Sequence, residues 1–506
     1  MVSDGNTISL LNQLLLKTRN TNQTLETFTV CFDHLGCIST TEEWFHPIYR
    51  PHNVRPLDRH TINTQFNVVT KASITNSSIL NLDFTQIKNG TELCGPSCSG
   101  KLVILIHDFT SNGFTGWHLA AVYIEQGDIT VASVDWQAGA EPPFEQAISN
   151  ARVVALEIIA FLKDAKRKDS SICLIGHGVG AHIAGYVGHT QPVSKIIGLD
   201  PTGPYFENMP TMVRLDPSDA HWVEVIHTDA FSARSQGTHT IMGHFDFFVN
   251  GANQQPHCNE SSPHVPKFTK LDRNSLKEGD ILPACSHKRA FKYFIEAIQN
   301  EDCEYVGFEC TNYKNFLEGK CLECINKTKA VFTKIGATER YSKKNGVSYF
   351  LKTAESSPFC LNPYKLKIYF EEKSHGLSSE RSGSFELIMV NQAGIIASAH
   401  PSSEIPIAFN TKGPYMMIYY GKQPLITDLA EVRLKWIHNP NSLCVFCNNN
   451  VYIQKVVVQL VTLSNEKTRG QVYKMCPTQE TVEVKSGAFI TLTKCKEKTH
   501  IKKETS

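Results

Sequence analysis

A glycine-rich turn holds the first residues whose spacing could support chemistry. Residues 174–185 read LIGHGVGAHIAG, and Gly176, Gly178 and Gly180 have the spacing of the G-x-S-x-G nucleophile elbow. In that motif the central serine attacks a carbonyl carbon and starts acyl transfer. The central residue here is Gly178, which has no hydroxyl group. The pattern therefore indicates a hydrolase that has lost its nucleophile, or an unrelated glycine-rich turn.

Around this turn, apolar runs alternate with helical patterns. Apolar residues recur at helical spacing over 142–168, and a second helix is expected from about residue 180. Strands that alternate with helices form a mostly parallel sheet with right-handed crossovers, and catalytic groups lie at the carboxyl ends of its strands. The fold class predicted is therefore α/β. The short apolar runs expected to be buried strands are 101–107, 129–136, 171–175, 194–201 and 221–229.

The pattern changes near residue 355. Short, partly alternating apolar segments follow, separated by turn residues, which predicts an antiparallel β-sandwich. Four of these segments are 363–373, 382–391, 430–439 and 451–462.

The predicted organisation has four parts. We expect an N-terminal extension without order (1–27), an α/β domain (28–354), a β-sandwich (355–495) and a polar tail (496–506).

The composition fits a globular protein with large cores. Hydrophobic residues make up 41% of the 506 residues, and 50 Lys and Arg balance 49 Asp and Glu. No apolar run approaches the roughly 20 residues that a transmembrane helix needs. We therefore expect neither a nucleic-acid partner nor a transmembrane segment.

The sixteen cysteines indicate an oxidising compartment. Their close pairs are scattered along the chain, whereas a zinc site needs its ligands in one small module. We therefore expect disulfides and a secreted protein, although Cys173, in a predicted strand, is expected to be a free core thiol. Residues 1–20 make a poor signal peptide, so we expect the true start to lie upstream; the alternative is export by an unusual route. Five sequons agree with export: Asn22, Asn76, Asn89, Asn259 and Asn326.

Seven stretches, taken in order, carry a family resemblance. They are FTVCFDHLGCIST (28–40), VDWQAGA (134–140), IGHGVGAHIAGYVG (175–188), IIGLDPTGP (196–204), VRLDPSDAHWVEVIHTDA (213–230), MGHFDFFVNG (242–251) and ACSHKRAFKYF (284–294). The chain resembles the animal pancreatic-type lipases and their related proteins over nearly its whole length. The resemblance implies an α/β-hydrolase domain followed by a small, lipid-associated, PLAT-like β-sandwich.

The same resemblance implies roles for individual residues. Asp200 matches the family's catalytic acid, His287 its histidine base, and Gly178 the position of the nucleophile. The backbone N–H groups of Val179 and Phe109 match the oxyanion hole. Asp108 stands where the family usually has glycine, and a carboxylate there would oppose the charge of an oxyanion.

Several of these residues also have a purely structural interpretation. Asp200 and His287 are expected to persist as a hydrogen-bonded pair without a catalytic role. His177, inside the elbow, is expected to be structural, and Trp136 and Trp222 are expected to be core residues.

The stretch TMVRLDPSD resembles the family's calcium site. The backbone carbonyl of Arg214 and the carboxylates of Asp216 and Asp219 would supply hard oxygen ligands. Thr211 replaces the family's leading glutamate, so one negative ligand is missing. The alternative is an exposed acidic turn that binds no metal.

The resemblance also implies a lid and a set of disulfides. The lid would lie between Cys258 and Cys285 and cover a groove for acyl chains; the alternative is a neutral surface loop. Cys94, Cys98, Cys444 and Cys447 have no counterpart in the family. The implied disulfides are Cys31–Cys37, Cys258–Cys285, Cys310–Cys321 and Cys476–Cys495.

The leading functional hypothesis is a secreted, catalytically inactive member of this family. It would bind lipid, or a protein partner, through the former acyl cleft and the sandwich. The first alternative is an active carboxylic ester hydrolase, a triacylglycerol lipase or phospholipase, with an unrecognised nucleophile. The second is a yolk-type storage protein.

Overall fold

The computed structural model describes most of the chain. The remaining residues include 1–26, the predicted lid (259–284), residues 497–506, all five sequons, and Cys94, Cys98, Cys444 and Cys447, so those predictions lie outside the described residues. The described ranges are 27–71, 80–83, 100–165, 168, 171–230, 235–258, 285–300, 302–322, 332–336, 346–371, 379–403, 405–422, 425–439, 450–462, 471–478 and 482–496.

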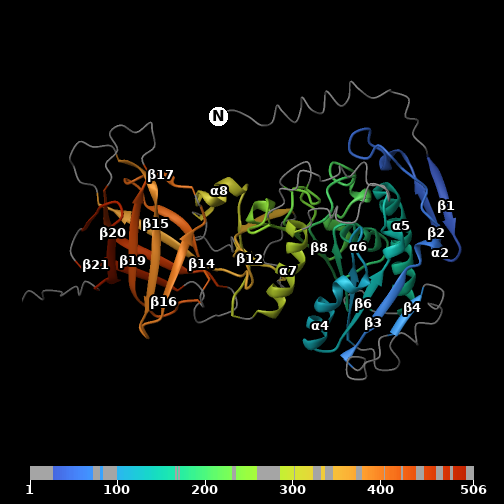
Figure 1. Ribbon diagram of the computed structural model, residues 1–506, viewed down its shortest axis with the longest axis horizontal. Helices are drawn as coiled ribbons and strands as arrows, with labels where there is room; N and C mark the ends of the chain where they lie inside the picture. Colours follow the sequence, from blue (N-terminus) through green and yellow to red (C-terminus); the bar gives the residue numbers. More distant parts are fainter. Residues whose placement is uncertain are drawn as a thin grey trace, which may run out of the picture.

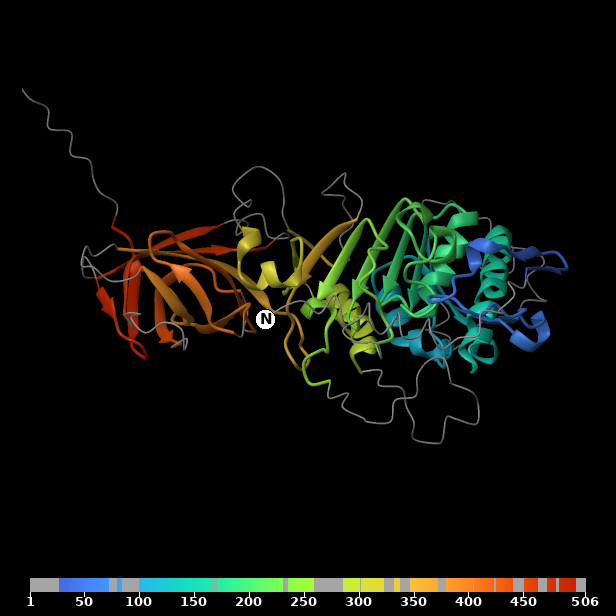
Figure 2. The same ribbon diagram turned by 90° about the horizontal axis from the view of Figure 1, so that it is seen from above.

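An eleven-stranded mixed sheet forms the centre of the first domain (Figures 1 and 2). In the spatial order given below, the strands between β6 and β13 pair in parallel, and antiparallel strands are added at both edges of the sheet. The α/β fold class is thus confirmed. In spatial order the strands are β12 (Phe332–Lys334), β11 (Val306–Glu309), β13 (Val347–Leu351), β10 (Phe245–Val249), β9 (Trp222–His227), β8 (Lys195–Leu199), β7 (Ile172–His177), β5 (Lys101–Ile106), β6 (Ile129–Asp135), β3 (Gln65–Val69) and β4 (Leu80–Asp83).

Helices cover both faces of this sheet. Helices α5 (Phe144–Ala165) and α6 (Val179–Thr190) share one core with the strand residues Ile104 and Leu174. Helices α4 (Trp117–Glu125) and α7 (Cys285–Gln299) share a second core with the neighbouring residues Leu105 and Ile175. Successive strand residues enter opposite cores because side chains alternate across a sheet, and this explains the continuous apolar runs in the sequence.

Shorter elements complete the first domain. A hairpin of β1 (Phe28–Phe32) and β2 (Gly36–Thr40) opens it, followed by α2 (Arg59–Ile62). Helix α8 (Tyr313–Leu317) lies near the second domain (Figure 1).

The second domain is the antiparallel β-sandwich that the sequence predicts. Its path closes on itself because β14 pairs with both β18 and β20. Alternate side chains, among them Trp436 and Phe385, fill its core. Its strands are β14 (Asn362–Phe370), β15 (Glu380–Asn391), β16 (Ile396–Pro401), β17 (Ile407–Asn410), β18 (Tyr415–Gly421), β19 (Leu429–His438), β20 (Val451–Leu460), β21 (Val472–Pro477), β22 (Val482–Val484) and β23 (Phe489–Lys494).

An apolar cluster joins the two domains. Phe308 and Phe350 from the large sheet pack in one cluster with Ile418 and Tyr420 of β18. Thr462 adds a polar contact, donating a hydrogen bond from Oγ1 to Glu304 Oε2 at 2.9 Å.

The structure contains all four disulfides that the resemblance implies. A fifth, Cys303–Cys360, was not predicted, because its cysteines are 57 residues apart and neither belongs to a close pair. Cys173 is a free thiol, as expected, and burial raises its pKa to about 11. Within the described part of the chain, no helix is long and apolar enough to cross a membrane.

Candidate functional site

Gly178 lies at the apex of a sharp turn between strand β7 and helix α6. Its backbone has φ +55° and ψ −117°, a conformation that costs a side-chain-bearing residue free energy and glycine much less. The turn is also tight, because a Cβ on Gly176 would lie 2.1 Å from the carbonyl oxygen of Gly180. The strand–turn–helix geometry is that of a nucleophile elbow without the nucleophile.

Asp200 and His287 meet beside this turn. Asp200 follows β8, and its Oδ2 lies 2.6 Å from Nδ1 of His287, the third residue of α7. The other carboxylate oxygen accepts hydrogen bonds from the backbone N–H groups of Thr228, at 2.7 Å, and Asp229, at 3.1 Å. Both side chains are buried, so Asp200 holds the imidazole in one orientation.

Asp108 follows strand β5 and points into the elbow. Its Oδ1 accepts a hydrogen bond from the Val179 backbone N–H at 2.7 Å, and its Oδ2 lies 2.9 Å from His287 Nε2. A Cβ built on Gly178 would lie 2.0 Å from that Oδ1 and 2.2 Å from Asp108 Cγ. The Asp108 carboxylate thus fills the space of the missing side chain and engages the expected oxyanion donor.

The site is a carboxylate–imidazolium–carboxylate chain. Burial alone would lower the pKa of His287, but its hydrogen bonds to Asp108 and Asp200 and their negative charges raise that pKa to about 10. Burial likewise opposes ionisation of Asp108, yet the His287 imidazolium lowers the pKa of this carboxyl to about 2. At neutral pH His287 carries a proton on both nitrogens and has no free lone pair to act as a base.

His177 supports the chain from one side. Its ring packs on the His287 ring with centroids 4.4 Å apart, and its Nε2 donates to the His287 carbonyl oxygen at 3.2 Å. Burial, followed by the positive charge of His287, lowers the pKa of His177 to about 4. It is therefore a neutral positioning residue, in line with the structural interpretation.

His107 positions the loop that carries Asp108. Its Nδ1 donates to the Asp108 carbonyl oxygen at 2.8 Å, and its Nε2 accepts from the Trp136 backbone N–H at 2.9 Å. Trp136 is fully buried, as predicted, and Nε1 donates to the His107 carbonyl oxygen at 3.0 Å. Trp222 is half-buried on β9 and stacks on His244.

The other expected oxyanion residue, Phe109, is buried with its ring edge-on to Phe144, the two centroids 5.1 Å apart. A pocket of about 20 Å³, the size of one water molecule, lies close by. His107, Ser133, His177, Leu199 and Phe291 are among its lining residues.

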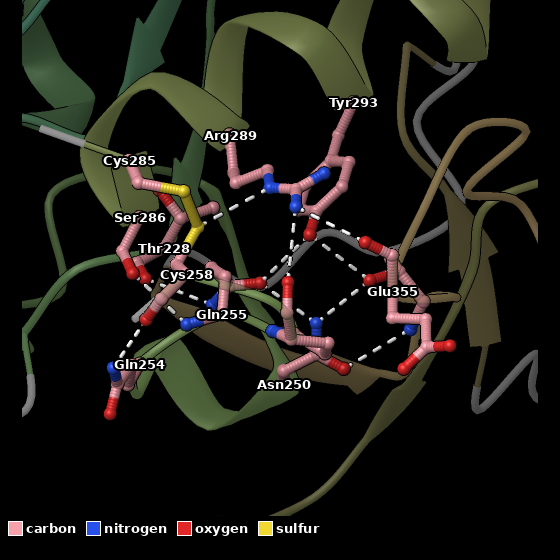
Figure 3. Close-up of a disulfide and its surroundings, with 12 residues drawn as sticks. Thr228, Asn250, Gln254, Gln255, Cys258, Cys285, Ser286, Arg289, Tyr293 and Glu355 are labelled. Atoms are coloured by element: carbon pink, nitrogen blue, oxygen red, sulfur yellow. Dashed lines mark hydrogen bonds between the residues drawn. A yellow bond between two sulfur atoms is a disulfide. The ribbon is translucent and has the colours of Figure 1, made fainter. Parts of the chain in front are cut away.

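Gln255 fixes the start of helix α7 (Figure 3). Its backbone N–H donates to Ser286 Oγ at 3.0 Å, next to His287. Its side-chain amide donates to the carbonyl oxygens of Thr228 and Val249, both at 2.9 Å. The amide thereby connects the histidine helix to the strand ends that hold Asp200. The sequence offered no signal for this role, since an isolated glutamine matches no motif.

The Cys258–Cys285 disulfide closes the same region (Figure 3). Arg289, one turn further along α7, donates to Cys258 Sγ at 3.5 Å and to the Glu355 carbonyl oxygen at 3.2 Å. The residues between the two cysteines belong to the predicted lid, which lies outside the described residues.

The predicted calcium ligands lie on a turn before strand β9. Asp216 caps the 3-10 helix Pro217–Asp219, and Asp219 Oδ2 accepts from the Asp216 backbone N–H at 2.8 Å. The Arg214 guanidinium lies 3.6 Å from Asp216 Oδ2. Burial raises the pKa of Asp219 to about 8, against the lowering effect of its hydrogen bond. The oxygen donors suit calcium, and a buried carboxyl of raised pKa would gain from a cation; calcium binding stays a prediction.

Three residues of the site have the arrangement of metal ligands. Asp108, His177 and His287 each offer a ligand atom, all within 4.8 Å of one another. Asp108 and His287 are already joined by a proton, which a metal would have to displace.

Comparison with known proteins places this geometry in a family. A family model described as Lipase matches residues 28–359. Inactive pancreatic lipase-related protein 1 of Homo sapiens is 33% identical over 354 residues, which cover 67% of this chain and 73% of that protein. Pancreatic triacylglycerol lipase of Oryctolagus cuniculus is 29% identical over 485 residues, covering 92% and 96%. Pancreatic lipase-related protein 2 of Myocastor coypus is 32% identical over 398 residues, covering 75% and 80%.

Proposed function

The chain belongs to the lipase family, and from that premise we propose that it is a secreted member that binds lipid in the former acyl cleft without hydrolysing esters. One observation carries the proposal. The Asp108 carboxylate fills the space of the missing nucleophile and accepts the hydrogen bond of the Val179 N–H.

The size of the catalytic loss supports an inactive site rather than a slow one. Removing the nucleophile of a serine hydrolase costs about 10⁶-fold in kcat, or roughly 8 kcal/mol of barrier. Occupation of one oxyanion donor costs about a further 10²–10³-fold. His287, protonated between two carboxylates, is also unable to take a proton from a substitute nucleophile.

Asp108 does not replace serine in ester hydrolysis. A carboxylate that adds to an ester carbonyl forms a tetrahedral intermediate with two possible leaving groups. The carboxylate is far less basic than the alkoxide, so the intermediate returns to the starting ester. The presence of a carboxylate at this position is therefore compatible with an inactive esterase.

Lipid binding is supported by features around the cleft. The disulfide that closes the lid region, Cys258–Cys285, is retained. Phe114 is exposed in the 3-10 helix Gly113–Gly116 that follows Asp108, and its ring stacks on Trp117. Two relatives are named as an inactive pancreatic lipase-related protein and a pancreatic triacylglycerol lipase, and lipid is the ligand that such a cleft would accept. The disulfides support a secreted protein, and a protein partner on the sandwich stays a prediction.

The test is an ester hydrolysis assay on the purified full-length protein with p-nitrophenyl butyrate. We expect no turnover above that of a His287→Ala variant. Turnover that disappears in His287→Ala would overturn the proposal. Lipid extraction and mass spectrometry of the native protein test the proposed lipid binding. A stoichiometric bound lipid supports a binding protein, whereas its absence favours the storage role.

A further inference from the structure

The Asp108 carboxylate fills the space of the missing side chain, and its surroundings are also those of a nucleophile. We propose that Asp108 attacks the carbon of an epoxide on a long apolar chain, and that the site hydrolyses the resulting ester to a vicinal diol. This inference rests on the proposed function, because the apolar chain of the epoxide must enter the lipid cleft. It adds a reaction that needs neither a serine nor a substrate ester.

Asp108 is oriented for such an attack. Val179 N–H fixes Oδ1, and His287 Nε2 lies next to Oδ2, so the carboxylate presents a defined oxygen. The side chains of Asp108, His287 and Asp200 are 9%, 2% and 0% exposed. Asp108 is thus the most exposed of these three side chains, and its carboxylate lies between His287 and the Val179 N–H.

The electrophile follows from the chemistry of a carboxylate. Attack on an ester carbonyl is reversed, as argued above. Attack on a strained epoxide carbon breaks the ring carbon–oxygen bond directly and leaves a stable ester. The apolar chain follows from the lipid cleft of the proposed function, so the substrate class is a lipid that carries an epoxide.

The first step uses the ion pair as it stands. Asp108 Oδ2 forms a bond to an epoxide carbon while that carbon's bond to the ring oxygen breaks. The ring oxygen receives the proton that His287 holds on Nε2. The products are an alkyl ester on Asp108, a neighbouring hydroxyl on the substrate, and neutral His287.

The second step returns the site to its resting state. With Asp108 esterified, His287 faces one carboxylate, Asp200, and its Nε2 can accept a proton from water. The water oxygen adds to Asp108 Cγ, and the negative charge develops on Oδ1, which already lies 2.7 Å from the Val179 nitrogen. The Cγ–Oδ2 bond then breaks, and the alkoxide takes the proton from His287. The acid formed returns its proton to His287, and the sum is epoxide plus water to diol.

The experiment incubates the full-length protein with the terminal epoxide of a long-chain alkane in water labelled with heavy oxygen. The diol and the peptide that contains Asp108 are analysed by mass spectrometry. We expect diol formation and heavy oxygen in the Asp108 carboxyl group, because water attacks Cγ rather than the substrate. Asp108→Asn should lose both, and so should His287→Gln, because no group then gives the ring oxygen its proton or activates the water.

Asp58→Asn provides a matched control, since Asp58 caps helix α2 on the surface away from the site. It should behave as the unchanged protein, and thermal melting of each variant verifies folding. Binding of the epoxide is measured separately by its co-elution with the protein in gel filtration. No co-elution means that the proposed lipid binding fails. Co-elution without diol and without label in Asp108 overturns this inference alone, as does equal turnover by Asp108→Asn.

Discussion

The carboxylate of Asp108 occupies the space that a side chain on Gly178 would need, with only 2.0 Å between Asp108 Oδ1 and the position of a Cβ at residue 178. Gly178 and Asp108, the two departures from the family pattern, are therefore parts of one structural arrangement. A side chain lost from the elbow is replaced by one that enters from the end of β5. Substitution at either position has consequences at the other.

Gly178→Ser alone should destabilise the protein and give little ester hydrolysis. The new Cβ meets the Asp108 carboxylate, and the φ of +55° is strained for serine. Overpacking of this kind costs about 1–3 kcal/mol of unfolding free energy. Chemical denaturation measures it, and an unchanged midpoint would contradict the predicted clash.

Asp108→Gly combined with Gly178→Ser should restore ester hydrolysis, which Gly178→Ser alone does not. Removing the carboxylate makes room for the serine, frees the Val179 N–H, and leaves the hydrogen bond between His287 and Asp200 in place. We expect ester hydrolysis at least about 10²-fold above that of Gly178→Ser, the value of one oxyanion donor. Adding His287→Ala should abolish it, and equal rates for the single and double variants would show that Asp108 is no obstacle.

The strands and helices around this site could be read from the sequence because burial on both faces leaves a signal. The runs at 101–107 and 171–175 match β5 and β7, and the apolar pattern over 142–168 matches α5. Strands β10 and β13 were not predicted as strands, although the motif at 242–251 contains β10. Edge strands such as β12 are too short to show a period.

The direction of the Asp108 side chain could not be predicted from the sequence. It depends on the approach of the β5 end to a turn 71 residues away and on where α7 places His287. The role of Gln255 could not be predicted for the same reason, because its hydrogen-bond partners come from three separate segments. The sequence thus predicts which residues form the site, whereas the tertiary contacts of their side chains determine its chemistry.

Calcium should raise the melting temperature of the protein through the turn that holds Asp216 and Asp219. A ligand at one hundred times its Kd adds about 2.7 kcal/mol of stability. Asp219→Asn should remove the calcium response because it removes a negative ligand. Differential scanning calorimetry with calcium and with a chelator measures this. An identical melting temperature in both, with the unchanged chain, would mean that the turn binds no calcium.

The ion pair of Asp108 and His287 should stabilise the fold over a defined pH range. The pKa of His287 rises from 6.5 to about 10 on folding, so its contribution is complete below pH 6.5 and is lost as the pH rises toward 10. The pKa of Asp108 falls from 3.8 to about 2, so its contribution is complete above pH 3.8 and is lost as the pH falls toward 2. The stabilisation is therefore greatest between pH 3.8 and 6.5.

His287→Gln tests this dependence, because glutamine keeps a hydrogen-bond donor and carries no charge. Leaving buried Asp108 and Asp200 without the imidazolium should cost about 3–5 kcal/mol of unfolding free energy at pH 6. The difference between the two proteins should shrink as the pH rises toward 10, since the unchanged protein then loses its proton. Urea titrations across this range measure the difference. A difference that stays constant with pH would mean that His287 is neutral in the folded protein, and the carboxylate–imidazolium–carboxylate chain would then be wrong.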